Sequence, residues 1–250
     1  MDALGDLVTR DRRSGDPALV APRETRRYDY RRFCNTAWKT GNFWRRRGVH
    51  EDATVAVADD PEPEAVFAFL GAALLGARTR FGLPDPDGAG DEPDSSSNVD
   101  ARVVVAPSDE VGGYPVPPGS QRVGYGGPPD DPAIAHFERD VWSENPAFPE
   151  TPVDPETVAL TTERGEFSHA DLLSAAREVA DDWGLELGDE VAVRAPFADP
   201  GTVVAGVVAP LSAGATILLP DDDAVGDFAV DGTGGRDAPE NEVVRPGDVF

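Results

Sequence analysis

Two ten-residue stretches decide the fold: GVHEDATVAV at residues 48–57 and GLELGDEVAV at residues 184–193. They align without a gap, and each begins with a glycine and ends in an alternating run of valine and alanine. Such a glycine commonly ends a helix, and a short run rich in valine is typical of a buried strand. Each stretch therefore predicts the end of a helix, a turn and a strand, and the chain contains two copies of one unit.

The helix that precedes each stretch has a clear start. Asp29 and Ser168 stand at the expected N-cap positions, and Asp171, three residues after Ser168, completes a capping box. Apolar side chains then recur at helical spacing: Tyr30, Phe33, Cys34, Ala37, Trp38 and Trp44 in the first copy, and Leu172, Leu173, Ala176, Val179, Ala180 and Trp183 in the second. We therefore predict two amphipathic helices.

Each predicted strand is followed by a second helix and a second strand. The helices are expected at residues 64–75 and 201–212, and the glycines Gly76 and Gly214 separate them from the strands that follow. The order helix, strand, helix, strand favours parallel pairing with helices on the faces of the sheet. We predict an α/β fold of two similar layered units with mainly parallel sheets.

Proline, glycine and aspartate mark the expected boundaries between these units. In chain order, we predict a first α/β unit at 1–83, a linker at 84–131 with a short strand at 102–106, a second α/β unit at 132–220 and an acidic flexible tail at 221–250. The tail is expected to contain one last strand at 243–244 and a turn.

The charge of the chain indicates adaptation to salt. It has 47 acidic and 22 basic residues, a net charge of −25, and Lys39 is its one lysine. A dense carboxylate surface with arginine in place of lysine suits a protein kept soluble at molar salt, as in haloarchaea, although an ordinary acidic protein is the simpler alternative. The first fifty residues hold 12 basic and 6 acidic side chains. They lack an aromatic stacking platform, so we do not expect nucleic-acid binding.

Cysteine content and hydropathy predict a cytoplasmic protein. The single cysteine, Cys34, excludes a disulfide framework and lies on the apolar side of a predicted helix. The amino terminus lacks the basic and apolar segments of a secretory signal. The longest apolar stretches, 65–77 and 203–215, are too short to span a bilayer.

Two segments resemble the acyl-adenylate-forming (AMP-dependent synthetase/ligase, acyl-CoA synthetase-like) superfamily. Residues 28–79 are similar to the opening of its large domain, and residues 158–173 resemble the sequence around its phosphate loop. The resemblance covers about residues 4–220 and implies a truncated form of the large domain, in which the second half repeats the architecture of the first. ATP or AMP with magnesium is expected as a cofactor only if the chain is part of a split synthetase that a partner domain completes.

The phosphate loop itself departs from the family. There it reads approximately T-S-G-T-T-G-x-P-K-G, whereas this chain has TTERGE at residues 161–166. Glycines in such a loop let backbone N–H groups surround the phosphates. The shorter loop keeps Thr161, Thr162 and Gly165 as remnant cofactor-binding residues, and its two glutamates would repel phosphate.

We identify no catalytic residue and no metal ligand from the sequence. The family's Tyr-Gly-x-Thr-Glu motif and its small domain with a catalytic lysine are missing. His169 follows a helix cap and is expected to be exposed, with a catalytic role as the alternative. A metal site at His136, Glu138 and Asp140 would lack a further histidine or cysteine at ligand spacing.

Two functional hypotheses follow from these residues. The first is a catalytically degenerate homologue that binds a ligand or accompanies a synthetase as an accessory subunit. The alternative is part of a split AMP-forming acyl-CoA synthetase, an acid–thiol ligase that uses ATP with magnesium and is completed by a lysine-bearing partner domain. An unrelated α/β protein with similar repeats is a third possibility. Neither nucleic acid nor a membrane is expected as a partner.

Overall fold

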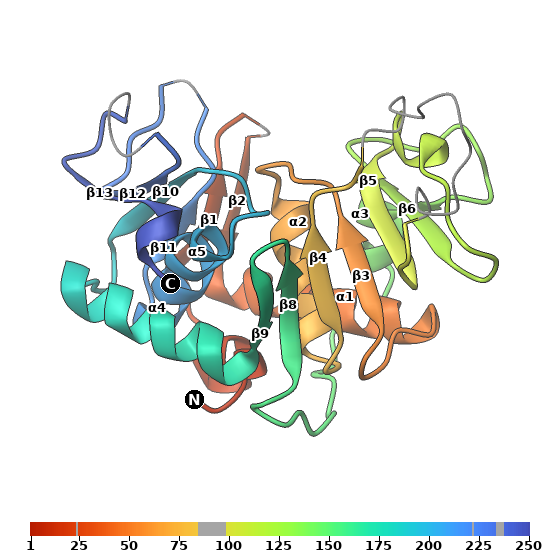
Figure 1. Ribbon diagram of the computed structural model, residues 1–250, viewed down its shortest axis with the longest axis horizontal. Helices are drawn as coiled ribbons and strands as arrows, with labels where there is room; N and C mark the ends of the chain where they lie inside the picture. The colour runs from red at the N-terminus through yellow and green to blue at the C-terminus, as the bar shows by residue number, and fades with distance from the viewer. Residues whose placement is uncertain (24, 85–98, 222, 234–237) are drawn as a thin grey trace.

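The computed structural model describes residues 1–250 apart from 24, 85–98, 222 and 234–237. Two sheets lie side by side along the long axis of the molecule, with sheet A on the left of Figure 1 and sheet B in the centre and on the right. Helix α4 runs across the front of the left half, close to the amino terminus.

The described residues form thirteen strands in these two sheets. In spatial order, sheet A contains β13 (Glu242–Val244), β12 (Phe228–Asp231), β10 (Glu190–Arg194), β11 (Thr216–Leu218), β1 (Pro17–Ala21) and β2 (Arg26–Asp29). Sheet B contains β7 (Ala135–His136), β6 (Gln121–Tyr125), β5 (Val103–Pro107), β3 (Thr54–Val57), β4 (Arg78–Phe81), β8 (Val158–Thr162) and β9 (Gly165–Ser168).

Helices connect these strands. The α-helices are α1 (Tyr30–Arg46), α2 (Pro63–Ala73), α3 (Phe137–Trp142), α4 (His169–Trp183), α5 (Pro200–Val203) and α6 (Ala209–Ala213). A π-helical segment, η5 (Val204–Val208), joins α5 to α6. The short 3-10 helices are η1 (Leu4–Val8), η2 (Arg10–Arg12), η4 (Val111–Gly113) and η6 (Pro246–Asp248).

The predicted α/β class with mainly parallel sheets is confirmed. Among the described strands, the two antiparallel pairs are the hairpins β1–β2 and β8–β9, and every other neighbouring pair is parallel. Parallel strands buried on both faces read as near-continuous apolar runs, and the buried residues of β3, β5 and β10 are valines and alanines.

The two halves exchange their hairpins. The hairpin β1–β2, which precedes α1 in the chain, joins sheet A through the parallel pairing of β1 with β11. The hairpin β8–β9, which precedes α4, joins sheet B through β8 and β4. The order β13-β12-β10-β11-β1-β2 in sheet A corresponds strand by strand to β6-β5-β3-β4-β8-β9 in sheet B. The repeat therefore extends beyond the helix and strand units that the sequence predicts.

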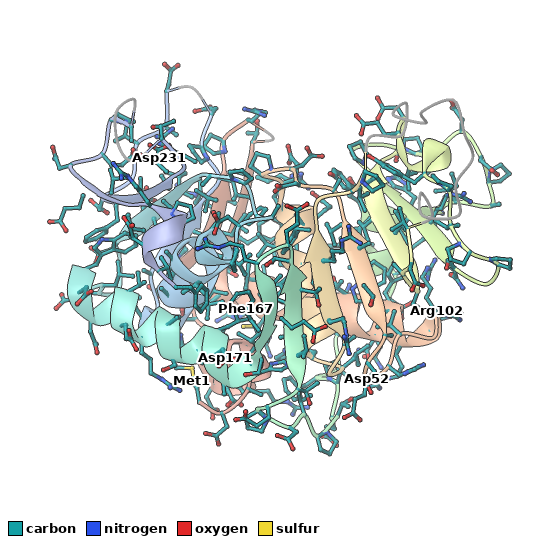
Figure 2. The ribbon with its side chains drawn as sticks, viewed as in Figure 1. Met1, Asp52, Arg102, Phe167, Asp171 and Asp231 are labelled. Carbon is teal, nitrogen blue, oxygen red and sulfur yellow. The ribbon has the colours of Figure 1, made fainter. Side chains whose placement is uncertain are left out.

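Both predicted helix starts are present. The Asp29 side chain accepts a hydrogen bond of 2.7 Å from the N–H of Arg32. Ser168 and Asp171 form a complete capping box at the start of α4, where Figure 2 labels Asp171. Gly184 ends this helix with a φ of +62°, a left-handed conformation that glycine adopts without steric cost.

The largest core lies between helices α1 and α2 and the sheets. Trp44 is fully buried, and its indole N–H donates to the carbonyl of Ala68 on α2 at 3.2 Å. Phe67 of α2 packs against both Tyr28 and Phe33, with ring centroids 5.1 Å apart in each case. Cys34 is a buried free cysteine in this core, as the sequence predicts. The aromatic side chains of α1 thus fix α2, and with it the loop at the end of β3.

The expected linker and tail contribute strands to the sheets. Within 84–131, β5 is shifted by one residue from the strand predicted at 102–106. Strand β6 pairs in parallel with β5, and the glycines and prolines around it gave no clear signal of a strand in the sequence. Within 221–250, β12 and β13 extend sheet A, and β13 includes the predicted last strand. Residues 85–98 of the expected linker lie outside the described residues, as do positions 222 and 234–237 of the tail.

No helix in the described ranges is long and apolar enough to cross a membrane.

Candidate functional site

A tight hairpin stands where the sequence predicts a phosphate loop. Strands β8 and β9 pair so that Thr162 lies opposite Gly165, which leaves a turn of two residues, Glu163 and Arg164. The hydroxyl of Thr162 accepts from the N–H of Arg164 at 3.1 Å and donates to the carbonyl of Gly165 at 3.3 Å. Gly165 has a φ of +139°, which a side chain would disfavour. A two-residue turn needs fewer residues than the family's phosphate loop, which accounts for the shorter sequence at this point.

The structure brings the three predicted remnant residues together in this hairpin. Thr162 and Gly165 close the turn, and Thr161 lies opposite Glu166. The hydroxyl of Thr161 is buried and has no hydrogen-bond partner among the described residues. The N–H of Arg164 is already bound to Thr162, so this turn differs from a loop whose N–H groups converge on a phosphate.

Two of the three charges of the hairpin, those of Arg164 and Glu166, are paired within the protein. Glu166 accepts from Arg78 at 3.1 Å, and Arg78 also contacts Asp52, labelled in Figure 2, at 3.2 Å. Arg164 lies 3.4 Å from Asp199, which caps the first turn of α5. Arg164, the cation of the turn itself, therefore already has a carboxylate partner.

Two cavities lie at the carboxyl ends of the parallel strands, which sequence reasoning missed. One of about 610 Å³ is lined by Asp60, Ser108 and Tyr125, which follow or end β3, β5 and β6. Another of about 480 Å³ lies beyond β10 and β11 and includes Phe197. In open α/β sheets ligands bind outside the carboxyl ends of the strands, where the strand order reverses. Here the order reverses between β3 and β5 and between β10 and β12.

The carboxyl edges of the two sheets are joined by Asp59. Its side chain follows β3 and accepts from the N–H groups of Phe197 at 2.6 Å and Ala198 at 3.2 Å, just beyond β10. Burial raises the pKa of Asp59, although these two donors oppose the shift. Asp60 accepts from the hydroxyl of Tyr125, and burial followed by this contact raises the pKa of Tyr125. The sequence signal for this site was the acidic pair Asp59 and Asp60, which follows the buried strand β3.

Three solved structures have a similar fold. The anthranilate CoA ligase AuaEII in complex with anthranoyl-AMP has a TM-score of 0.75 and 19% sequence identity, covering 92% of this chain and 49% of that chain. A benzoate CoA ligase from Burkholderia xenovorans LB400 has a TM-score of 0.73 and 18% identity, covering 91% and 50%. The N-terminal domain of FACL13 from Mycobacterium tuberculosis has a TM-score of 0.66 and 18% identity, covering 89% and 58%.

The chain has the fold of the large domain of acyl-adenylate-forming enzymes. It spans about half the length of the two CoA ligases. No protein-family model matches the sequence, and no curated protein matches it significantly. At these identities the similarity to the adenylate-forming enzymes establishes the fold.

His169 is not in the candidate site of this adenylate-forming fold. The sequence predicts an exposed cap residue, but the side chain is fully buried beneath the amino-terminal segment, where Nδ1 accepts from the N–H of Leu4 at 3.1 Å. That expectation was wrong because residues 1–8 fold over the start of α4, a contact between segments about 165 residues apart. Burial lowers the pKa of His169 from 6.5 to about 4, while Asp6 opposes the shift.

The burial of His169 predicts loss of stability in mild acid. Between pH 6.5 and 4 the unfolded chain binds a proton that the folded protein excludes, because burial disfavours the charged imidazolium. A proton on Nδ1 would also face the N–H of Leu4. This contribution to stability is present above pH 6.5 and is lost as the pH falls through about 4. We expect a loss of about 2 kcal/mol from this residue.

Urea unfolding at pH 7 and pH 4.5 checks this prediction. The control is His169→Asn, whose amide oxygen can still accept from Leu4 but does not titrate. The variant is expected to lose less stability than the wild type across this interval. Equal losses in both proteins would show that carboxylates elsewhere cause the acid sensitivity.

The residues considered as metal ligands do not form a metal site. His136 Nε2 lies 3.0 Å from Glu138, and Asp140 contacts Arg139 at 2.7 Å. In the described ranges no group of three or more histidine, cysteine or acidic side chains could hold a metal ion.

Proposed function

We propose that this chain is a catalytically degenerate form of the acyl-adenylate large domain that acts as a ligand-binding or accessory protein. The observation that supports it most directly is the two-residue turn between Thr162 and Gly165. Adenylate-forming enzymes resembling this chain hold the ATP phosphates with a longer glycine-rich loop. A turn whose N–H and hydroxyl groups bond to each other offers few donors to a polyanion.

The electrostatics of the turn support the same proposal. Glu163 is exposed at its tip, and Arg164 is paired with Asp199. A triphosphate would have to displace Asp199 from Arg164 and would still approach a carboxylate. Each unit charge repelled at about 4 Å costs roughly 1 to 4 kcal/mol at surface dielectric values. The fold is thus retained while the phosphate-binding chemistry is lost.

We expect the protein to bind neither ATP nor AMP at concentrations up to about 1 mM, which corresponds to a binding free energy weaker than about −4 kcal/mol. Titration calorimetry with magnesium in molar KCl measures this directly. Thermal unfolding with and without ATP is an independent readout, since a ligand that binds the folded state raises the midpoint.

Two variants show whether any nucleotide binding arises at the hairpin. Arg164→Met removes the cation of the turn, and Arg177→Met removes an exposed cation on α4 that donates to the Met1 carbonyl. The proposal of a degenerate large domain would be contradicted by ATP or AMP binding with a micromolar dissociation constant, provided that Arg164→Met weakens this binding and Arg177→Met does not.

The split synthetase is the second candidate, and the fold that the chain shares with two CoA ligases supports it. The chain spans about half of the CoA ligases with which it shares a fold. In this candidate a lysine-bearing partner domain completes an AMP-forming acid–thiol ligase. The test is the exchange of pyrophosphate into ATP. Exchange that requires both a carboxylic acid and a co-purifying lysine-bearing domain would establish the split synthetase. We place the protein in the cytoplasm of a salt-adapted cell in either case, on the basis of its charge and hydropathy.

A further inference from the structure

We propose that a cavity between α1, α2 and α3 binds an organic anion with a planar aromatic body. The cavity has a volume of about 870 Å³, within the range of about 300 to 1,000 Å³ usual for small-molecule sites. Its lining comes from β2, the first half of α1, the start of α2, α3 and Pro146. It shares no lining residue with the β8–β9 hairpin, so the inference goes beyond the proposed function and does not depend on it.

The floor and rim of the cavity are aromatic. Tyr28, Phe67 and Phe137 are almost completely buried beneath it. Trp142 stands at the rim with 74% of its surface exposed. An indole exposed to this extent beside an apolar floor offers a free face on which a flat ring can stack.

Three of the four cations that line the cavity have no carboxylate partner in the described part of the chain. Arg31 and Arg32 line the cavity from the first turn of α1 and Lys39 from about two turns further on, and no ion pair joins them to a carboxylate among the described residues. The ammonium of Lys39 lies 4.8 Å from the Trp142 ring and donates to the Trp142 carbonyl at 2.5 Å. Lys39 can donate two further hydrogen bonds, so it can bind the anionic group of a ligand that lies in the cavity.

The carboxylates that line the cavity already have partners. Glu64 is paired with Arg26, Glu138 accepts from the N–H of Gly126 at 2.7 Å, and Asp29 caps α1. The four cations and three carboxylates give the lining a formal charge of +1 on a protein of net charge −25. A locally positive concavity on an acidic protein selects for anions, and low-dielectric walls strengthen that preference.

The experiment uses naphthalene-2-sulfonate, which is flat and remains ionised, and naphthalene-2-sulfonamide, which has nearly the same shape without the charge. Binding to the full chain is measured by calorimetry in molar KCl. We expect the sulfonate to bind with a dissociation constant below about 1 mM and the sulfonamide at least about fivefold more weakly.

Variants locate the site. Lys39→Met and Trp142→Ala are each expected to weaken sulfonate binding about fivefold to tenfold. The matched control is Arg177→Met, which removes one positive charge from α4, outside the cavity, and is expected to leave binding unchanged. Circular dichroism confirms that each variant is folded.

Three results would overturn the proposal. The first is the absence of sulfonate binding at several millimolar. The second is equal binding of sulfonate and sulfonamide, which would remove the role of the cations. The third is equal weakening by Arg177→Met and Lys39→Met, which would indicate attraction to overall charge instead of binding in this cavity.

Discussion

Replacing Trp44 with alanine is expected to lower the free energy of unfolding by about 4 kcal/mol. The side chain is fully buried on α1, and its ring lies 5.0 Å from that of Phe43 and 5.9 Å from that of Phe137. Its N–H donates to the Ala68 carbonyl, so the substitution also leaves a buried acceptor without that donor. A glycine at position 71 brings α2 close to α1, since a Cβ there would lie 3.0 Å from the indole. This close packing limits how far the core can collapse around the cavity.

The matched control for Trp44→Ala is Trp142→Ala. Trp142 is 74% exposed, and its removal is expected to change stability by less than about 0.5 kcal/mol. Reversible urea unfolding in molar KCl, followed by circular dichroism, measures both variants. Similar losses in the two would mean that the interface between α1 and α2 is not the main core of the molecule.

Replacing Arg26 with methionine is expected to cost about 3 to 5 kcal/mol at neutral pH. The Glu64 side chain is only 3% exposed, and Arg26 contacts both of its oxygens, one of them at 3.0 Å. Arg26 also reaches Glu62 at 3.2 Å. Without Arg26, the Glu64 carboxylate stays buried but loses the ion pair that offsets the free-energy cost of removing the charge from water.

The loss from Arg26→Met should depend on pH in a defined direction. Burial raises the pKa of Glu64 even with Arg26 present, and removal of Arg26 should raise it further. A group whose pKa is raised in the folded state favours the fold below its unfolded pKa and loses that contribution as the pH rises. We therefore expect a smaller deficit relative to the wild type at pH 5 than at pH 8.

Two controls separate burial of charge from loss of packing. In the double variant Arg26→Met with Glu64→Gln, the uncharged amide should restore most of the lost stability. Arg164→Met breaks a more exposed pair with Asp199 and is expected to change stability by less than about 1 kcal/mol. A deficit that is unchanged by pH and by the second substitution would exclude the unpaired carboxylate as its cause.

Sequence reasoning was most accurate where the deciding contacts are local. Asp29 and Ser168 were predicted as caps because a cap bonds to an N–H two or three residues further along the chain. The first long helix was found from the spacing of its aromatic residues, which reflects the helical period. The shortness of the segment at 161–166 was also visible in the sequence, but its two-residue hairpin turn was not predicted.

The same reasoning failed where the deciding contact is distant. His169 has the local pattern of an exposed cap-turn residue, and only the amino-terminal segment makes it a buried acceptor. Strand β6 and the cavity beside Tyr125 depend on pairing across loops that carry little apolar pattern. The cavity beneath Trp142 forms because α3 packs against α1, about 100 residues earlier in the chain.

The sequence by itself determined the two long helices α1 and α4 with their caps, the strands β3, β4, β10 and β11, and the α/β class. Each of these depends on residues within a few positions of one another. Only the tertiary structure decided that the hairpins β1–β2 and β8–β9 are exchanged between the halves, with β1 beside β11 and β8 beside β4. The physical reason is that strand pairing is set by which apolar faces can be buried together in three dimensions, and the order of elements along the chain does not contain that information.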